Sequence, residues 1–240
     1  MYACADLLME HSPNRPSQNS ELRVWIANQG PYVAYFGNPQ AGFDIHLNTN
    51  DHLWCQVTYQ FAHELCHVVA QFLPHQHANV WFEEVLCETA SIYSLDRIVF
   101  ACASGNPPHP WLNTFQSGGA PYFVAMQDYV AELMNDPARQ LMGTIPEWVQ
   151  KHEPELRINP YLRDRTNIAS NFLVPRVLQT PTILATIESL NVSPCPAGQD
   201  SLSEYFQRWK NSTPEPSRAH VVDLIELFVP SVGTAGEATA

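Results

Sequence analysis

The spacing of apolar residues predicts a small sheet near the N-terminus. Three short apolar stretches are typical of strands: residues 22–27, 32–36 and 43–47. In the third stretch, Phe43, Ile45 and Leu47 alternate with polar residues, which is the period of a half-buried strand. Gly30 and Pro31 mark a turn between the first two.

Beyond residue 53 the period changes to that of helices. Over residues 54–72, apolar side chains such as Val57, Phe61 and Leu65 recur at spacings of three and four. A second helical stretch covers residues 80–103 and stops before a Gly-Asn-Pro-Pro segment. The short connection between the two stretches predicts that these helices pack against each other.

The rest of the chain has mostly helical spacing. Helices are expected at residues 122–134, 145–151, 168–177, 181–190, 202–209 and 220–228. The pattern therefore predicts an α+β fold, in which a small N-terminal mixed β-sheet packs on the two long helices and a mainly helical C-terminal half follows. The expected division is an N-terminal extension (1–20), an α+β subdomain (21–108), a helical subdomain (109–230) and a disordered tail (231–240).

Composition narrows the classes of partner. The chain of 240 residues has 24 acidic and 12 basic residues, and its formal charge is −12. This balance argues against nucleic acid or an anionic membrane as a partner, because both require a basic surface. No apolar run is long enough for a membrane span. The 6 cysteines are scattered without a C-x-x-C pair, so we expect reduced thiols and a cytoplasmic protein.

The first long helix contains the clearest chemical motif, because His63-Glu64-Leu65-Cys66-His67 matches H-E-x-x-H. Histidines four positions apart on a helix point the same way, one turn apart, and can take two corners of a zinc tetrahedron. Glu64 is then placed to act as general base on a water at an open metal position. The alternative is a helix whose histidines only line a polar groove. The apolar flank argues against it, since buried histidines need partners.

The second long helix offers further carboxylates in Trp81-Phe-Glu-Glu-Val-Leu-Cys-Glu88. With the H-E-x-x-H motif, this segment resembles the gluzincin metallopeptidases, the zincin group that includes thermolysin-like enzymes and glutamate-zinc aminopeptidases. The resemblance covers residues 54–91 and implies that Glu84 is the third zinc ligand. It also implies that Glu88 accepts the N–H of a ligand histidine. Taken alone, the residues leave Glu83 and Glu88 open as the ligand.

The resemblance also implies elements for substrate binding. Residues 43–47 stand where gluzincins have a strand that binds extended substrate backbone, by strand addition at an exposed edge. Acidic side chains near the expected cleft, including those of Glu83 and Asp44, predict a modest preference for basic or amino-terminal substrate groups. A donor to the tetrahedral oxyanion is expected from one of Tyr122, Tyr129, His152 and Tyr161.

The leading functional hypothesis is a zinc-dependent peptidase that acts on peptide or protein substrates. His63, His67 and Glu84 hold Zn²⁺ in this hypothesis, and Glu64 takes a proton from the attacking water. The alternative is a non-catalytic zinc-containing binding or regulatory protein with a zincin-like fold. A third possibility is a helical scaffold in which the motif is coincidental.

Overall fold

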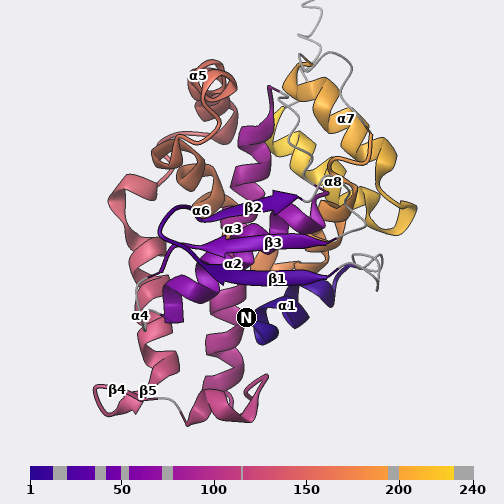
Figure 1. Ribbon diagram of the computed structural model, residues 1–240. Helices are drawn as coiled ribbons and strands as arrows, with labels where there is room; N and C mark the ends of the chain where they lie inside the picture. The colour runs from indigo at the N-terminus through magenta and orange to yellow at the C-terminus, as the bar shows by residue number, and fades with distance from the viewer. Residues whose placement is uncertain are drawn as a thin grey trace, which may run out of the picture.

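The computed structural model describes residues 1–12, 21–35, 42–49, 54–71, 78–114, 116–193 and 200–229. This part of the chain has an α+β fold, with a small mixed sheet near the N-terminus and a mainly helical C-terminal half. Both features confirm the expectation from the sequence. Figure 1 shows the sheet lying across the two long helices α2 (Trp54–Val69) and α3 (Val80–Ala103). The expected tail at 231–240 lies outside the described residues.

The sheet has the strand order β1 (Leu22–Ile26), β3 (Phe43–Leu47), β2 (Tyr32–Tyr35). Strand β3 runs parallel to β1 and antiparallel to β2. Its apolar residues are buried, as the alternation predicted. The expectation that this strand adds a substrate strand at an exposed edge is wrong, because both edges of β3 are already paired within the sheet. Strand β2 has no second partner among the described strands and so forms an outer edge of this sheet.

Helix α3 is the central element of the core, and every residue from Val80 to Leu95 is buried. The polar residues of this stretch include three serine and threonine side chains, besides Tyr93, whose hydroxyl contacts His11. These three donate to carbonyl groups one turn earlier: Thr89 to Val85, Ser91 to Cys87 and Ser94 to Ala90. The helix can therefore be buried on all sides without orphaned hydroxyls. It ends before Gly105, whose φ of +77° is a left-handed conformation that glycine favours.

The N-terminal residues contribute to the same core. Tyr2–Met9 form helix α1, which the sequence pattern did not predict, and its buried residues Ala3, Cys4 and Leu8 face α2 and α3. The segment expected to be an extension therefore begins with a packed helix.

The C-terminal half consists of helices and short 3-10 segments. The helices are α4 (Tyr122–Asn135), α5 (Ile145–Ile158), α6 (Arg163–Gln179), α7 (Leu202–Ser212) and α8 (Glu215–Phe228). The shorter elements are η1 (Pro110–Asn113), η2 (Pro137–Arg139), η3 (Pro181–Ser189) and the hairpin β4 (Gln116–Ser117) to β5 (Ala120–Pro121). Helices α5, α6 and α8 are longer than the apolar spacing predicted, and 181–189 is 3-10 rather than α-helical.

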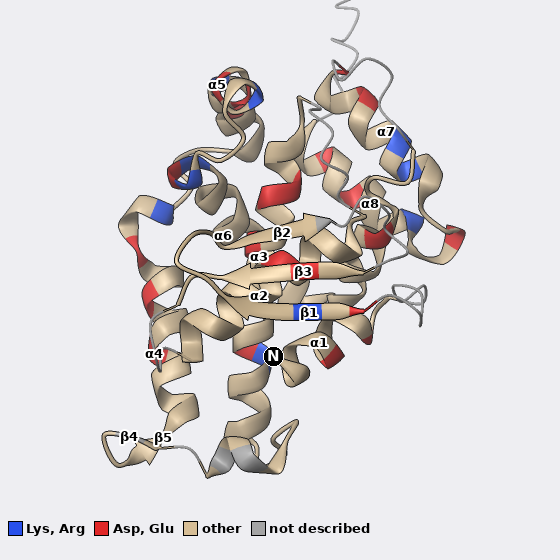
Figure 2. Cartoon of the chain, in the orientation of Figure 1, with Lys and Arg blue, Asp and Glu red and all other residues tan. Residues whose placement is uncertain are grey.

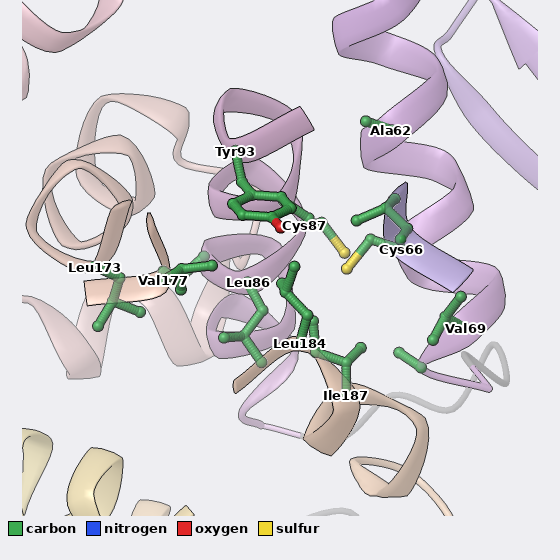
Figure 3. Close-up of a cluster of buried hydrophobic side chains, with 14 of the residues drawn as sticks. Ala62, Cys66, Val69, Leu86, Cys87, Tyr93, Leu173, Val177, Leu184 and Ile187 are labelled. Atoms are coloured by element: carbon green, nitrogen blue, oxygen red, sulfur yellow. The ribbon is translucent and has the colours of Figure 1, made fainter. Parts of the chain in front are cut away.

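One hydrophobic core joins the two halves of the chain. Figure 3 shows Leu173 and Val177 of α6 and Leu184 and Ile187 of η3 close to α3, on the side where Leu86 lies. No helix in the described ranges is both long enough and apolar enough to cross a membrane. Figure 2 shows acidic positions distributed over helices on several sides of the molecule, with few basic positions between them.

Candidate metal centre

The two histidines of the H-E-x-x-H motif lie on the side of α2 that faces α3. His63 and His67 are both buried, and their ring centroids are 5.1 Å apart. The contact between α2 and α3 is extensive, and it covers most of the surface of both rings. The helical spacing thus brings the two imidazoles together as the motif predicted.

Glu84 of α3 lies between the two rings. One carboxylate oxygen, Oε2, is 3.1 Å from His63 Nε2, and the other, Oε1, is 3.3 Å from His67 Nε2. Ligand atoms about 2.0–2.1 Å from a tetrahedral zinc ion lie roughly 3.3 Å from one another. The donor types and these two separations are compatible with a metal ion such as Zn²⁺, and the three ligand atoms all lie within 4.8 Å of one another.

Glu83 contacts the other side of His67. Its Oε1 accepts a hydrogen bond of 2.6 Å from His67 Nδ1, and its Oε2 accepts one of 2.7 Å from the amide of Asn191. The Glu83 side chain is completely buried. This arrangement fixes the ring of His67 and leaves Nε2 directed at Glu84, which is the usual support for a metal-binding histidine.

Glu88 lies near the corresponding nitrogen of the other histidine. Its Oε2 is 3.9 Å from His63 Nδ1, which is longer than a hydrogen bond. The carboxylate is ion-paired with the buried guanidinium of Arg139. Glu88 is thus adjacent to His63, and its strongest contact is with Arg139.

The charges around the histidines are unbalanced. Three buried carboxylates, those of Glu83, Glu84 and Glu88, face one guanidinium, that of Arg139. Burial on its own would raise the pKa of Glu84, but the neighbouring imidazoles lower it well below its usual range. Burial would lower the pKa of His67, yet the carboxylates of Glu84 and Glu83 raise it well above its usual value. Buried negative charge of this kind is stabilised by a cation, which can be the imidazolium of His67 or a bound divalent metal ion.

A cavity of about 250 Å³ opens next to the histidines. It is lined by Pro31, Tyr32, Val33, His63, Glu64, His67, Glu84, Tyr161 and Arg163. Glu64 thus faces the same space as the three metal-binding candidates. Burial raises the pKa of Glu64, while the two imidazoles partly offset that effect. Edge strand β2 supplies one wall, in place of the strand that the sequence suggested.

The structure separates the four candidate oxyanion donors. Tyr161 lines the cavity and is largely exposed at its mouth. The other three are absent from its lining. Tyr122 accepts a hydrogen bond from the Cys55 amide, Tyr129 packs on Tyr59, and His152 packs on Trp148. Tyr161 is therefore the candidate with access to a substrate.

A second group of potential ligands lies behind His67. His67, Glu83 and Cys87 bring one ligand atom each within 4.8 Å of one another. In Figure 3 the sulfur atoms of Cys66 and Cys87 point toward each other between α2 and α3. This group shares His67 with the first and is buried, whereas the first group faces the cavity.

Three residues of the site were not predicted from the sequence: Arg139, Arg163 and Asn191. Asn191 is 108 positions from Glu83, and Arg139 is 51 positions from Glu88. No local pattern indicates such distant contacts. Arg163 gave a weak signal only, as a basic residue close to the oxyanion candidate Tyr161.

Comparisons with known protein families, with curated proteins and with solved structures find no match for this chain. The likeness to the gluzincins remains a prediction that rests on the motif residues.

Proposed function

We propose that this chain is a zinc-dependent peptidase of the gluzincin type. The observation that carries the proposal is the position of Glu84, whose two oxygens lie 3.1 and 3.3 Å from the Nε2 atoms of His63 and His67. These residues share one cavity with Glu64. His63, His67 and Glu84 hold Zn²⁺ in this proposal, and the buried excess of carboxylates supports a divalent ion there.

Hydrolysis then requires a general base and a donor to the oxyanion, and the chain supplies both. A bound zinc ion supplies a Lewis acid that polarises a carbonyl group and lowers the pKa of water. The carboxylate of Glu64 accepts the proton of the attacking water and passes it to the leaving amine. The raised pKa of Glu64, caused by burial, suits a group that takes and returns a proton. The hydroxyl of Tyr161 donates to the oxygen of the attacked carbonyl.

The test is a Glu64→Gln variant assayed against a peptide library. Gln has nearly the same shape but cannot accept the proton, so hydrolysis should fall by about 10²–10⁴-fold while stoichiometric zinc is retained. The control is Glu132→Gln on the exposed face of α4, which should leave the rate unchanged. Freshly purified protein without stoichiometric zinc contradicts the proposal.

The small size of the cavity favours a second candidate function, in which a peptide end is bound without being cleaved. A volume of about 250 Å³ lies just below the range of about 300–1,000 Å³ that is typical of ligand pockets. A non-catalytic zinc-containing binding protein would hold a short peptide end without cleaving it. Full zinc content with peptide binding but no turnover by the unaltered protein, across the whole library, favours this alternative.

A further inference from the structure

We propose that Arg163 binds a substrate carboxylate, so that the site selects peptides with a negative charge within one residue of the cleaved bond. This inference rests on the proposed function and names the substrate class of the same cavity. It reverses the preference for basic groups that the acidic composition suggested.

Arg163 provides the positive charge of the cavity. Among the residues that line it, Arg163 is the one permanent cation, and it is the first residue of α6. The lining carboxylates have other roles, because Glu84 contacts both histidines and Glu64 is the candidate base. Arg163 and Glu64 line the same cavity.

The guanidinium of Arg163 is available for a ligand. Most other arginines in the described part of the chain are paired with a carboxylate: Arg23 with Asp44, Arg97 with Asp96, Arg139 with Glu88, Arg157 with Glu153, Arg165 with Asp164, Arg208 with Asp200 and Arg218 with Glu215. In the part of the chain that the structure describes, no acidic group lies within ion-pair distance of Arg163. An unpaired arginine at the mouth of a cavity is suited to a planar anion from the ligand.

The acids that suggested a basic substrate are not free to attract one. Glu83 is completely buried and bonded to His67 and Asn191. Asp44 lies on β3, 2.7 Å from the guanidinium of Arg23. Neither residue lines the cavity. Apart from the candidate base Glu64, the charge that lines the cavity beside the proposed ligand group is therefore that of Arg163.

The small cavity limits where the substrate carboxylate can be. A volume of about 250 Å³ accommodates little more than one or two residues beyond the metal-binding group. Both the carboxylate at a peptide's C-terminus and the side chain of Asp or Glu present the same group at that range. Tyr161, two positions before Arg163, also lines the cavity, and its one hydroxyl donor is assigned above to the attacked carbonyl, so the substrate carboxylate is left to Arg163.

The experiment uses two pairs of matched peptides. One pair differs in a C-terminal carboxylate against a C-terminal amide, and the other in Glu against Gln beside the cleaved bond. Each is measured as kcat/KM with the zinc-loaded protein and as affinity for the Glu64→Gln variant. We expect the acidic member of at least one pair to be favoured about tenfold, and the favoured pair identifies the source of the carboxylate.

Substitution of Arg163 tests the assignment directly. Arg163→Gln should remove the preference, and Arg163→Glu should reverse it in favour of a Lys-containing peptide. The matched control is Arg176→Gln, an exposed arginine near the other end of α6 that stacks on Phe172, and it should change nothing.

The outcomes separate the two proposals. If peptides are hydrolysed without a preference for the acidic member of either pair, or if Arg163→Gln leaves that preference intact, the role of Arg163 is overturned and the peptidase proposal stands. If acidic peptides bind preferentially through Arg163 but no peptide is hydrolysed, the peptidase proposal is overturned and the role of Arg163 stands. Neither binding nor hydrolysis of any peptide overturns both.

Discussion

The two candidate ligand histidines are supported in different ways. The carboxylate on His67 belongs to Glu83, whose second oxygen is held by the neutral amide of Asn191. The carboxylate near His63 belongs to Glu88, whose charge is shared with Arg139. A carboxylate without a cationic partner increases the basicity of the imidazole that donates to it. His67 is therefore expected to be the stronger donor to a metal ion.

The Glu83→Gln variant tests whether the Glu83 carboxylate strengthens metal binding by His67, because it replaces one carboxylate oxygen with an amide nitrogen. The amide of glutamine can accept from His67 or from Asn191, but not from both, because its second polar atom is itself a donor. We expect zinc affinity, measured by competition with a chelator, to fall about 10–100-fold. Asn191→Leu should weaken zinc binding in the same direction, because it removes the donor that orients Glu83.

The thermal stability of the metal-free protein distinguishes positioning from general damage. A positioning role predicts a larger loss in the zinc-loaded protein than in the metal-free one. Equal losses in both forms would show that Glu83 and Asn191 only stabilise the fold. Asn135→Ala, at an exposed asparagine of α4, is the control.

Two helices of the C-terminal half begin with reciprocal capping boxes. In α5, Thr144 accepts from the Glu147 amide while Glu147 accepts from Thr144. Ser201 and Glu204 repeat the arrangement at the start of α7. These caps satisfy amide groups that have no partner within their helices.

The caps predict an acid-sensitive contribution to stability. Hydrogen bonds from the Thr144 backbone and side chain lower the pKa of Glu147, and those from Ser201 lower that of Glu204. Both carboxylates titrate at lower pH in the folded state than in the unfolded state, where 4.5 is the ordinary value. Their contribution is therefore complete above the unfolded pKa and is lost as the pH falls through the folded pKa.

A double variant, Glu147→Gln with Glu204→Gln, isolates this effect. The variant should unfold at lower denaturant concentration than the parent at pH 7, and the difference should shrink as the pH falls below about 4.5. A difference that stays constant down to pH 2 would show that the charge of these carboxylates contributes nothing.

Local spacing was enough to predict the long elements and the side-by-side placement of His63 and His67. The bounds of α3 agree with the prediction at both ends, because its apolar run stops at a glycine and prolines. Helix α1 was missed, since eight residues without a side-chain cap give little local signal. Arg139 and Asn191 could not be predicted, because their roles exist only once distant segments have packed together.

At the scale of the whole molecule, the core connects α2 and α3 to the C-terminal helices. Phe82 of α3 precedes Glu83 and Glu84 in sequence and packs its ring on four aromatic side chains of α7 and α8: Tyr205, Phe206, Trp209 and Phe228. All four are buried. This continuity predicts that the described part of the chain unfolds as one cooperative unit.

The Phe206→Ala variant tests the packing between α3 and the C-terminal helices by removing the α7 side of the contact with Phe82. Phe206 is fully buried, so the substitution should destabilise the protein by about 3–5 kcal/mol. Circular dichroism and tryptophan fluorescence should still report one transition with one midpoint. Two separate transitions would show that the helical half folds on its own.

The sequence positions of the ligands have a consequence for how the centre is made in the cell. His63, His67 and Glu84 follow one another closely along the chain, whereas the amide that holds Glu83 comes 108 residues later. During translation the three ligands leave the ribosome together, well before Asn191. If the proposed zinc centre exists, a nascent chain could bind the ion through a short loop. The later helices would then enclose an ion that already joins α2 to α3.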